Sequence, residues 1–186
     1  MSNISPLNEY HESLLHLPTE NGVIKSDIEG WLQPIEAHYL YECAYNSHNI
    51  LELGSYHGLS TSIMAQAKYD AGNKGSITTL DVFEENILQT KQNIKVDVNI
   101  NYVTADAINY VMELNNKPLP EFYDLIFIDA NHTYEWMKLL TKNIHILSDG
   151  KILFHDFFHR ATGVKQAVEE ILGPANQQVA SIGVYE

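Results

Sequence analysis

Acidic residues stand at the end of five apolar segments that the sequence predicts as strands. These residues are Glu52, Asp81, Asp106, Asp129 and Asp156. The carboxyl ends of parallel strands meet at one edge of an open α/β sheet, and ligands bind outside that edge. A single carboxylate after a strand is commonly a helix cap, whereas five at one edge repel one another unless a ligand, a cation or hydrogen-bond donors compensate. The pattern therefore predicts a ligand-binding edge.

Residues 49–66 predict a strand, a glycine turn and a helix. The apolar run 50–53 is typical of a strand buried on both faces, Gly54 and Gly58 follow it, and apolar residues from Leu59 recur at helical spacing. Such a junction can hold a nucleotide-like ligand, because the turn lets the ligand approach the backbone beside the helix N-terminus.

The glycine spacing distinguishes this turn from two phosphate-binding motifs. Gly-x-x-x-Gly is neither the dinucleotide fingerprint G-x-G-x-x-G nor a Walker A sequence with its lysine. Asp81 lies 23 residues after Gly58, which is the position from which a carboxylate reaches a pair of ribose hydroxyls. An acidic edge disfavours a pyrophosphate and suits a ligand that carries ribose, adenine and a positive centre.

The elements that position these residues alternate regularly along the chain. Strands are expected at residues 49–53, 76–80, 100–104, 123–129 and 151–155, with a last one within 177–185. Helices are expected at residues 59–71, 84–95, 107–115, 133–147 and 162–172. This alternation predicts an α/β, Rossmann-like fold with a doubly wound, mostly parallel sheet of six or seven strands and helices on both faces.

The first part of the chain is patterned differently. Residues 1–27 are interpreted as an N-terminal extension or lid, and residues 28–186 as one α/β domain. Apolar residues recur at helical spacing over 28–46, with a candidate capping box at 26–29. Pro34 lies inside this pattern and predicts either two helices or a kinked one.

Composition narrows the class of protein and of partner. The chain has 186 residues and a formal net charge of −13, with 24 acidic against 11 basic residues, so nucleic acid and anionic membranes are unlikely partners. The single Cys43 excludes an internal disulfide and fits a reducing compartment. The sequence has no apolar run of membrane-spanning length and no signal-peptide pattern, so a cytoplasmic location is expected.

The motifs along the chain resemble those of one known family. The run ILELGSYHGLST at residues 50–61 is similar to motif I of class I S-adenosylmethionine-dependent methyltransferases, and is closest to the catechol-type and macrolide-sugar O-methyltransferases. The resemblance spans about residues 28–172. Later stretches agree with it in order: TLD ending at Asp81, TAD ending at Asp106, YDLIFIDANHTYE at 123–135 and GKILFHD at 150–156.

The resemblance implies which residues bind the cofactor, S-adenosylmethionine. Those implied to line or flank its methionine and ribose portion are Glu52, Gly54, Ser55, Tyr56, Gly58 and Ser60. Asp81 is implied to bind the ribose hydroxyls, and Asp106 and Ala107 to border the adenine. Asp129 is implied to lie near the cofactor amino group and the transferred methyl group.

A divalent metal is a second cofactor that the resemblance suggests. In metal-dependent members, the aspartate at the position of Asp129 joins an acidic pair after the next strand to hold Mg²⁺. Asp156 matches the first member of that pair, but Phe157 stands where Asp or Asn is expected. Asp129 and Asp156 are therefore the predicted ligands, completed by waters or a substrate diol. His132 or His155 can contribute, although imidazole suits Zn, Fe or Ni better than Mg²⁺.

His132 is the candidate general base. It follows Asp129 by three residues and matches the Asp-x-x-His of the macrolide-sugar enzymes. Histidine can take a proton from a hydroxyl near neutral pH. The alternative is that His132 is a helix-entry residue that bonds Asp129 or the backbone. His155 is interpreted as structural, orienting Asp156 or a substrate. Candidates for shaping the acceptor pocket are Tyr134, Trp136, Phe157, Phe158 and Arg160.

The sequence thus predicts methyl transfer from S-adenosylmethionine to a hydroxyl of a small molecule such as a sugar, a phenol or a natural-product intermediate. One alternative is a non-catalytic S-adenosylmethionine-binding domain. A nicotinamide-dependent oxidoreductase is less favoured, because the glycine spacing differs and a Tyr-x-x-x-Lys pair is absent. The short C-terminal segment can leave a sheet edge exposed, and a homodimer that covers this edge is a further hypothesis.

Overall fold

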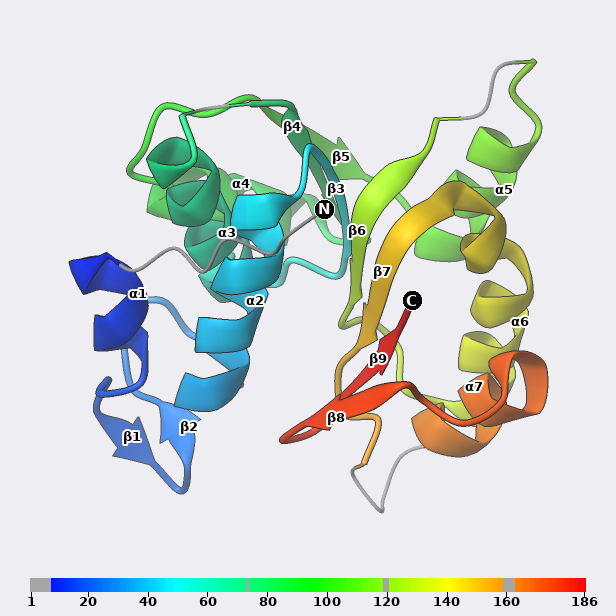
Figure 1. Cartoon of the computed structure of the whole chain (residues 1–186). Helices are drawn as coiled ribbons and strands as arrows, with labels where there is room; N and C mark the ends of the chain where they lie inside the picture. Colours follow the sequence, from blue (N-terminus) through cyan, green and yellow to red (C-terminus); the bar gives the residue numbers. More distant parts are fainter. Residues whose placement is uncertain (1–7, 73, 119–120, 159–162) are drawn as a thin grey trace.

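The structure is a computed structural model that describes residues 8–72, 74–118, 121–158 and 163–186 (Figure 1). Its centre is a sheet with the strand order β5-β4-β3-β6-β7-β9-β8. The strands are β3 (Asn49–Leu53), β4 (Ser76–Asp81), β5 (Ile100–Thr104), β6 (Tyr123–Ile128), β7 (Ser148–Phe154), β8 (Gln177–Val179) and β9 (Ile182–Tyr185). The strands β3 to β7 run parallel, and β9 runs antiparallel to both β7 and β8.

Helices cover both faces of this sheet. In Figure 1, α2, α3 and α4 lie on one side and α5, α6 and α7 on the other. The bounds are α2 (Pro34–Asn46), α3 (Leu59–Asp70), α4 (Glu84–Asn93), α5 (Ala107–Asn115), α6 (Tyr134–Ile144), the 3₁₀ helix η1 (His145–Leu147) and α7 (Val164–Leu172). The predicted α/β, Rossmann-like, doubly wound fold is confirmed. The C-terminal residues form a short antiparallel pair, which gives this sheet seven strands in the part of the chain that is described.

The central strands are apolar because both of their faces are buried. In β6, Leu125 and Phe127 pack in the core beneath α2 and α3, whereas Ile126 and Ile128 pack in the core beneath α5, α6 and α7. Successive side chains of a strand point to opposite faces, so one uninterrupted apolar run serves two cores. This places β3 and β6 in the middle of the sheet, where the strand order reverses.

The predicted helical segment over residues 28–46 is wrong at its start. The helix α2 begins at Pro34, and residues 26–33 are not helical. Proline fits the first position of a helix, where its missing N–H is not needed. The Glu36 carboxylate accepts a hydrogen bond from the Gln33 backbone N–H at 2.9 Å, so the capping interaction is here and not at 26–29.

The N-terminal residues that the structure describes pack beside α2. The helix α1 (Glu9–Leu14) contacts α2 and is followed by a hairpin of β1 (Thr19–Glu20) and β2 (Val23–Ile24). Residues 1–7 of the predicted extension, and residue 162 of the predicted last helix, lie outside the described residues. In the part of the chain that is described, no helix is long and apolar enough to cross a membrane.

The turn after β3 depends on a glycine. Gly54 has a φ of +96°, and a methyl group on it would overlap the carbonyl oxygen of Asp129. This close approach joins the turn after β3 to the turn after β6, across the point where the strand order reverses. The Asp129 N–H also donates to the Leu53 carbonyl at 2.9 Å, so the two turns are held backbone to backbone.

We expect Gly54→Ala to lower the free energy of unfolding by at least about 3 kcal/mol, because strain and a backbone overlap combine. Gly72→Ala is the matched control, since Gly72 also has a positive φ, +83°, but nothing lies within 4 Å of an added methyl group. In this control the free energy of unfolding should fall by only about 1 kcal/mol. Urea denaturation monitored by circular dichroism measures both, and equal losses would contradict the close approach.

Candidate active site

A cavity of about 390 Å³ opens at the carboxyl ends of β3, β4, β5 and β6. The residues of the sequence prediction that line it are Gly54, Ser55, Tyr56, Ser60, Asp81, Asp106, Ala107, Asp129 and His132. Glu52, Gly58 and Asp156 are not among its lining residues. The structure therefore brings most of the predicted site residues around one cavity and separates three of them from its wall.

The turn after β3 forms one side of the cavity. The N–H groups of Gly54 and Ser55 both donate to the Leu80 carbonyl of β4, at 2.9 and 3.1 Å. Tyr56 continues the turn with a φ of +45°. The Ser55 hydroxyl is buried and makes no hydrogen bond with any described residue. A buried hydroxyl at a cavity wall is available to a ligand, because leaving it unpaired costs free energy.

Asp81 is held rigidly beside this turn. One carboxylate oxygen accepts from the Tyr56 N–H, and the other accepts from the Phe83 N–H and the Asn86 amide, each at 3.0 Å. A carboxylate offers about four acceptor positions, so one remains for a further donor. The predicted neighbour of a ribose therefore lies fixed at the cavity wall with capacity for one more hydrogen bond.

Asp106 is both a helix cap and a residue of the cavity wall. Its side chain accepts a hydrogen bond from the Asn109 N–H at 3.0 Å, at the N-terminus of α5. The adjacent Ala107 lies on the same wall. The helix-cap alternative considered for each acidic residue thus applies to Asp106, without removing it from the cavity.

Glu52 does not face the cavity. Its carboxylate is fully buried and accepts hydrogen bonds from the hydroxyls of Thr61 and Thr79, each at 2.6 Å, and of Ser60. Burial raises the pKa of Glu52 to about 7, although these three donors oppose the shift. Glu52 is therefore not at the cavity wall, where a direct cofactor contact was expected, but it fixes Ser60, which lines the cavity.

Gly58 is also placed behind the wall. It is the N-cap of α3 with a φ of +88°, and a methyl group on it would press against Thr90 of α4. The Thr90 hydroxyl donates to the Tyr56 carbonyl at 2.9 Å. Gly58 therefore lets α4 pack closely against the turn after β3, and it is not among the residues that line the cavity.

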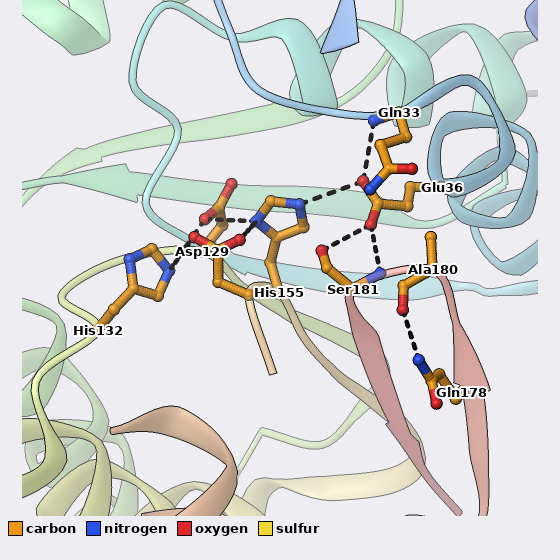
Figure 2. A network of polar contacts seen from close by, with 9 residues as sticks. Gln33, Glu36, Asp129, His132, His155, Gln178, Ala180 and Ser181 are labelled. Carbon is orange, nitrogen blue, oxygen red and sulfur yellow. Dashed lines mark hydrogen bonds and ion pairs between the residues drawn. The ribbon is translucent and has the colours of Figure 1, made fainter. Parts of the chain in front are cut away.

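A chain of histidine and acidic side chains extends from the other side of the cavity into the core (Figure 2). His155, only 3% exposed, lies with Nδ1 at 3.1 Å from Asp129 Oδ1 and with Nε2 at 3.4 Å from Glu36 Oε2. Burial acts to lower the pKa of His155, but the two carboxylates outweigh it and raise that pKa well above the usual value. His155 thus carries a positive charge between two negative ones.

This arrangement keeps Asp129 ionised. Burial acts to raise the pKa of Asp129, but His155 and His132 hold it well below its usual range. His132 Nε2 lies 3.3 Å from Asp129 Oδ1 and 3.9 Å from Asp156 Oδ2. The predicted base and its aspartate are therefore adjacent at the cavity wall, and His155 orients Asp129 as well as lying near Asp156.

The donor set does not fit the predicted Mg²⁺ site. Phe157 is 1% exposed and packs on Tyr185 and Phe158, so its side chain lies in the core and away from the acidic residues. Asp129 and Asp156 are then accompanied by two imidazoles, whereas Mg²⁺ prefers an octahedron of oxygen ligands.

Two residues of the site, Glu36 and Trp31, were not identified by any sequence motif. Glu36 is fully buried on α2 and anchors His155 and also Ser181, whose N–H and hydroxyl donate to Glu36 Oε1 at 2.8 and 2.6 Å. Its only signal is a glutamate three residues after Gln33 and two after Pro34, typical of a helix start. Trp31 lines the cavity from the irregular segment before α2, where the helical spacing of the sequence had predicted a helix and no site residue.

The predicted acceptor pocket is partly supported. Trp136 lines the cavity, but Tyr134 and Phe158 do not, and the Tyr134 hydroxyl donates to Glu170 at 2.7 Å. Phe157 belongs to the core, and Arg160 lies outside the described residues. Trp31 and Trp136 are therefore the tryptophans that the structure places at the cavity.

Comparison with known proteins agrees with the family resemblance of the sequence motifs. A family model described as "Methyltransferase domain" matches residues 51–157. The tapetum-specific methyltransferase 1 of Arabidopsis thaliana is 29% identical over 114 residues, which are 60% of this chain and 47% of that protein. The chain thus spans about half the length of this curated relative.

Solved structures share the fold. A Podospora anserina methyltransferase with bound S-adenosylhomocysteine (SAH) has a TM-score of 0.60 and 21% identity, over 75% of this chain and 68% of that chain. An O-methyltransferase from Bacillus cereus in complex with SAH has a TM-score of 0.56 and 20% identity, over 88% of this chain and 76% of that chain. At these sequence identities, the similarity to the two solved structures shows a shared fold and nothing more.

Glu52 generates a prediction on pH dependence. Its pKa is raised from 4.5 to about 7 in the folded protein, so the native state binds this proton more tightly than the unfolded chain. The stabilisation is fully present below pH 4.5 and is lost as the pH rises through 7, by about 3 kcal/mol in total. Glu52→Gln should remove this slope and raise the free energy of unfolding at pH 8 relative to the wild type.

Urea denaturation between pH 4.5 and 8 measures this slope. Glu85→Gln, at an exposed position of α4, is the matched control and should keep the wild-type slope. A Glu52→Gln protein whose stability changes with pH as the wild type does would show that Glu52 is not the titrating group.

Proposed function

The chain belongs to the methyltransferase domain family, and we propose that it transfers a methyl group from S-adenosylmethionine to a hydroxyl group of a small molecule. The observation that carries the proposal is one cavity with two differently built sides. One side has the glycine turn with the fixed carboxylate of Asp81, and the other has an ionised Asp129 beside His132.

The residues around the turn after β3 suit the cofactor. The cradle formed at Gly54 has no room for a side chain, the Ser55 hydroxyl lacks a hydrogen bond among described residues, and Asp81 has capacity for one more donor. In the proposed complex the Asp81 carboxylate accepts a hydrogen bond from a ribose hydroxyl of S-adenosylmethionine. Asp106 and Ala107 border the adenine, and Asp129 faces the amino group of the cofactor. Ser60, fixed by Glu52, supports the methionine portion.

S-adenosylmethionine supplies an electrophilic methyl group when bound. The acceptor oxygen must lose its proton for methyl transfer, and we assign this proton to Nδ1 of His132, because Nε2 is buried and faces Asp129. The ionised Asp129, 3.3 Å away, stabilises the imidazolium that results. Asp129 is itself held by His155, so the proton acceptor is oriented by side chains that are fixed before the acceptor binds.

The walls near His132 suit a small, partly aromatic acceptor. Trp31 and Trp136 offer flat apolar surfaces at the cavity, and Asn131 offers an amide beside them. Phenols and sugars both stack on such surfaces while presenting hydroxyl groups to a base. A phenol, a sugar or a related natural-product intermediate therefore remains the proposed class of acceptor.

Ligand binding separates the proposed function from its alternatives. We expect SAH and S-adenosylmethionine to raise the melting temperature by several degrees at 1 mM, because each fills the cavity of the native state only. NAD⁺ and NADP⁺ should have no effect. Stabilisation by the nicotinamide cofactors alone would contradict the proposal. Binding of SAH without methyl transfer to any acceptor of a phenol and sugar panel would favour a non-catalytic binding domain.

The role of His132 is tested by its removal. With an acceptor from that panel and with EDTA present, His132→Gln should lower kcat by about 10²–10⁴-fold, because the positioned base is lost. The affinity for SAH should change by less than about 3-fold, since the cofactor is bound on the other side of the cavity. SAH release measures turnover, and calorimetry measures affinity. Unchanged turnover would remove His132 from its proposed role.

A further inference from the structure

The charged side chains beside the cavity converge on one point. The donor atoms of Asp129, His132 and His155 all lie within 4.8 Å of one another. Asp129 Oδ1 is 3.1 Å from His155 Nδ1 and 3.3 Å from His132 Nε2. The side chains come from the ends of β6 and β7 and from the segment before α6, so three separate parts of the backbone hold them together.

These distances suit a small metal ion. Ligand atoms at about 2.0–2.2 Å from a tetrahedral metal lie about 3.3–3.5 Å apart. The two separations from Asp129 Oδ1, 3.1 and 3.3 Å, are close to this value, and the third lies within 4.8 Å. Asp156 can supply a fourth ligand, since its oxygens lie 3.9 Å from His132 Nε2 and 3.8 Å from His155 Nδ1. Small side-chain rotations would therefore bring four donors around one centre.

The surroundings of His155 are those of a metal ligand. Its Nε2 faces the fully buried Glu36, which leaves Nδ1 directed at Asp129 and the convergence point. Metal-binding histidines usually donate their other N–H to a carboxylate or carbonyl in this way, and that partner fixes the ring. Glu36 is in turn held by Ser181 and by the Gln33 N–H.

Charge and hydrogen bonding also favour a cation. Asp129, Asp156 and Glu36 bring three carboxylates to the cluster, and His155 supplies one compensating charge. His132 Nε2 is buried and makes no hydrogen bond with any described residue, although it lies close to Asp129 Oδ1. A dication would balance the excess negative charge and use the lone pair of this nitrogen.

We infer that Asp129, His132, His155 and Asp156 form a binding site for a divalent transition metal ion of the Zn²⁺ class, and not for Mg²⁺. Two imidazoles and two carboxylates match the ligand preference of Zn²⁺, Fe²⁺ or Ni²⁺. Phe157 leaves the acidic pair incomplete for Mg²⁺, and His155 takes the place of the missing oxygen ligand.

The metal and the proton compete for the same atoms. Zn²⁺ binding displaces the proton on Nδ1 of His155 to solvent, so affinity falls as the pH is lowered. It also occupies Nε2 of His132, through which Asp129 supports the imidazole as a base in the proposed methyl transfer. Zn²⁺ should therefore inhibit that reaction, but the metal site itself does not depend on the proposed function.

Calorimetry on the EDTA-treated, exchanged full chain tests the site with ZnCl₂ and MgCl₂ as probes. We expect one Zn²⁺ per chain at this site at pH 7.5, bound at least 100-fold more tightly than Mg²⁺. Co²⁺ should give the intense visible absorption of a tetrahedral site. Equal affinities for Zn²⁺ and Mg²⁺, or an octahedral Co²⁺ spectrum, would overturn the inference.

Variants locate the ion. His132→Gln, which changes a residue at the cavity wall, and His155→Gln should each weaken Zn²⁺ binding at least 100-fold and abolish the Co²⁺ spectrum. Glu36→Gln should weaken it by about 10–100-fold, because the ring of His155 loses its anchoring charge. Circular dichroism and melting temperature verify folding, and His132→Gln alone decides the outcome if the buried variants do not fold.

The matched control is a second histidine cluster. The donor atoms of His11, Glu12 and His38 also lie within 4.8 Å of one another, between α1 and α2. The rings of His11 and His38 are stacked with centroids 3.7 Å apart, an arrangement in which one ion cannot lie in both ring planes. His38→Gln should therefore leave the tight Zn²⁺ site intact. Loss of that site in His38→Gln, with retention in His132→Gln, would overturn the inference.

Discussion

The position of His155 between the buried carboxylate of Glu36 and the carboxylate of Asp129 at the cavity wall is the constraint on which this side of the cavity depends. Glu36 comes from α2, Asp129 from the end of β6, and His155 from the end of β7. A buried charge is tolerated only where a partner and hydrogen bonds compensate it. Each of the three residues therefore requires the other two, and together they fix the relative positions of a helix, two strands and the C-terminal hairpin.

The cavity consists of two halves that meet at the reversal of strand order. The turn after β3 and the carboxylate at the end of β4 form a preorganised binding half, in which backbone N–H groups hold the acidic side chain. The residues after β6 and β7 form the half suited to chemistry. Gly54 allows the two halves to touch, because only a hydrogen in place of a side chain leaves room for the Asp129 carbonyl.

In our two proposals the same cluster holds either a proton or a metal ion, and these two states exclude one another because they use the same ring nitrogens. In the proposed reaction His155 keeps its proton, and Asp129 supports His132 as the base by facing its Nε2. In the proposed metal complex the ion coordinates that Nε2 instead, so His132 loses the support of Asp129. Phe157 contributes to neither state, since it packs against Tyr185 beneath the C-terminal hairpin.

Much of the fold could be predicted because its signals are local. Apolar runs, helical spacing and glycine turns each depend on residues within a few positions, and they gave the alternation of strands and helices from residue 49 onwards. The exception was the segment before α2, where the apolar spacing continued through residues that are not helical. Pro34 and Glu36 form a helix start there, and this local signal was outweighed by the longer pattern.

The sequence by itself determined that several carboxylates gather at one edge, and it located the glycine turn, Asp81, Asp129 and His132 there. Only the tertiary structure decided which of the carboxylates face the cavity. Glu52 is turned toward hydroxyls of α3 and β4, and Glu36, 119 residues before His155, completes the charged cluster from another helix. The direction of a buried side chain depends on the partners that surround it, and those partners come from parts of the chain that no local pattern connects.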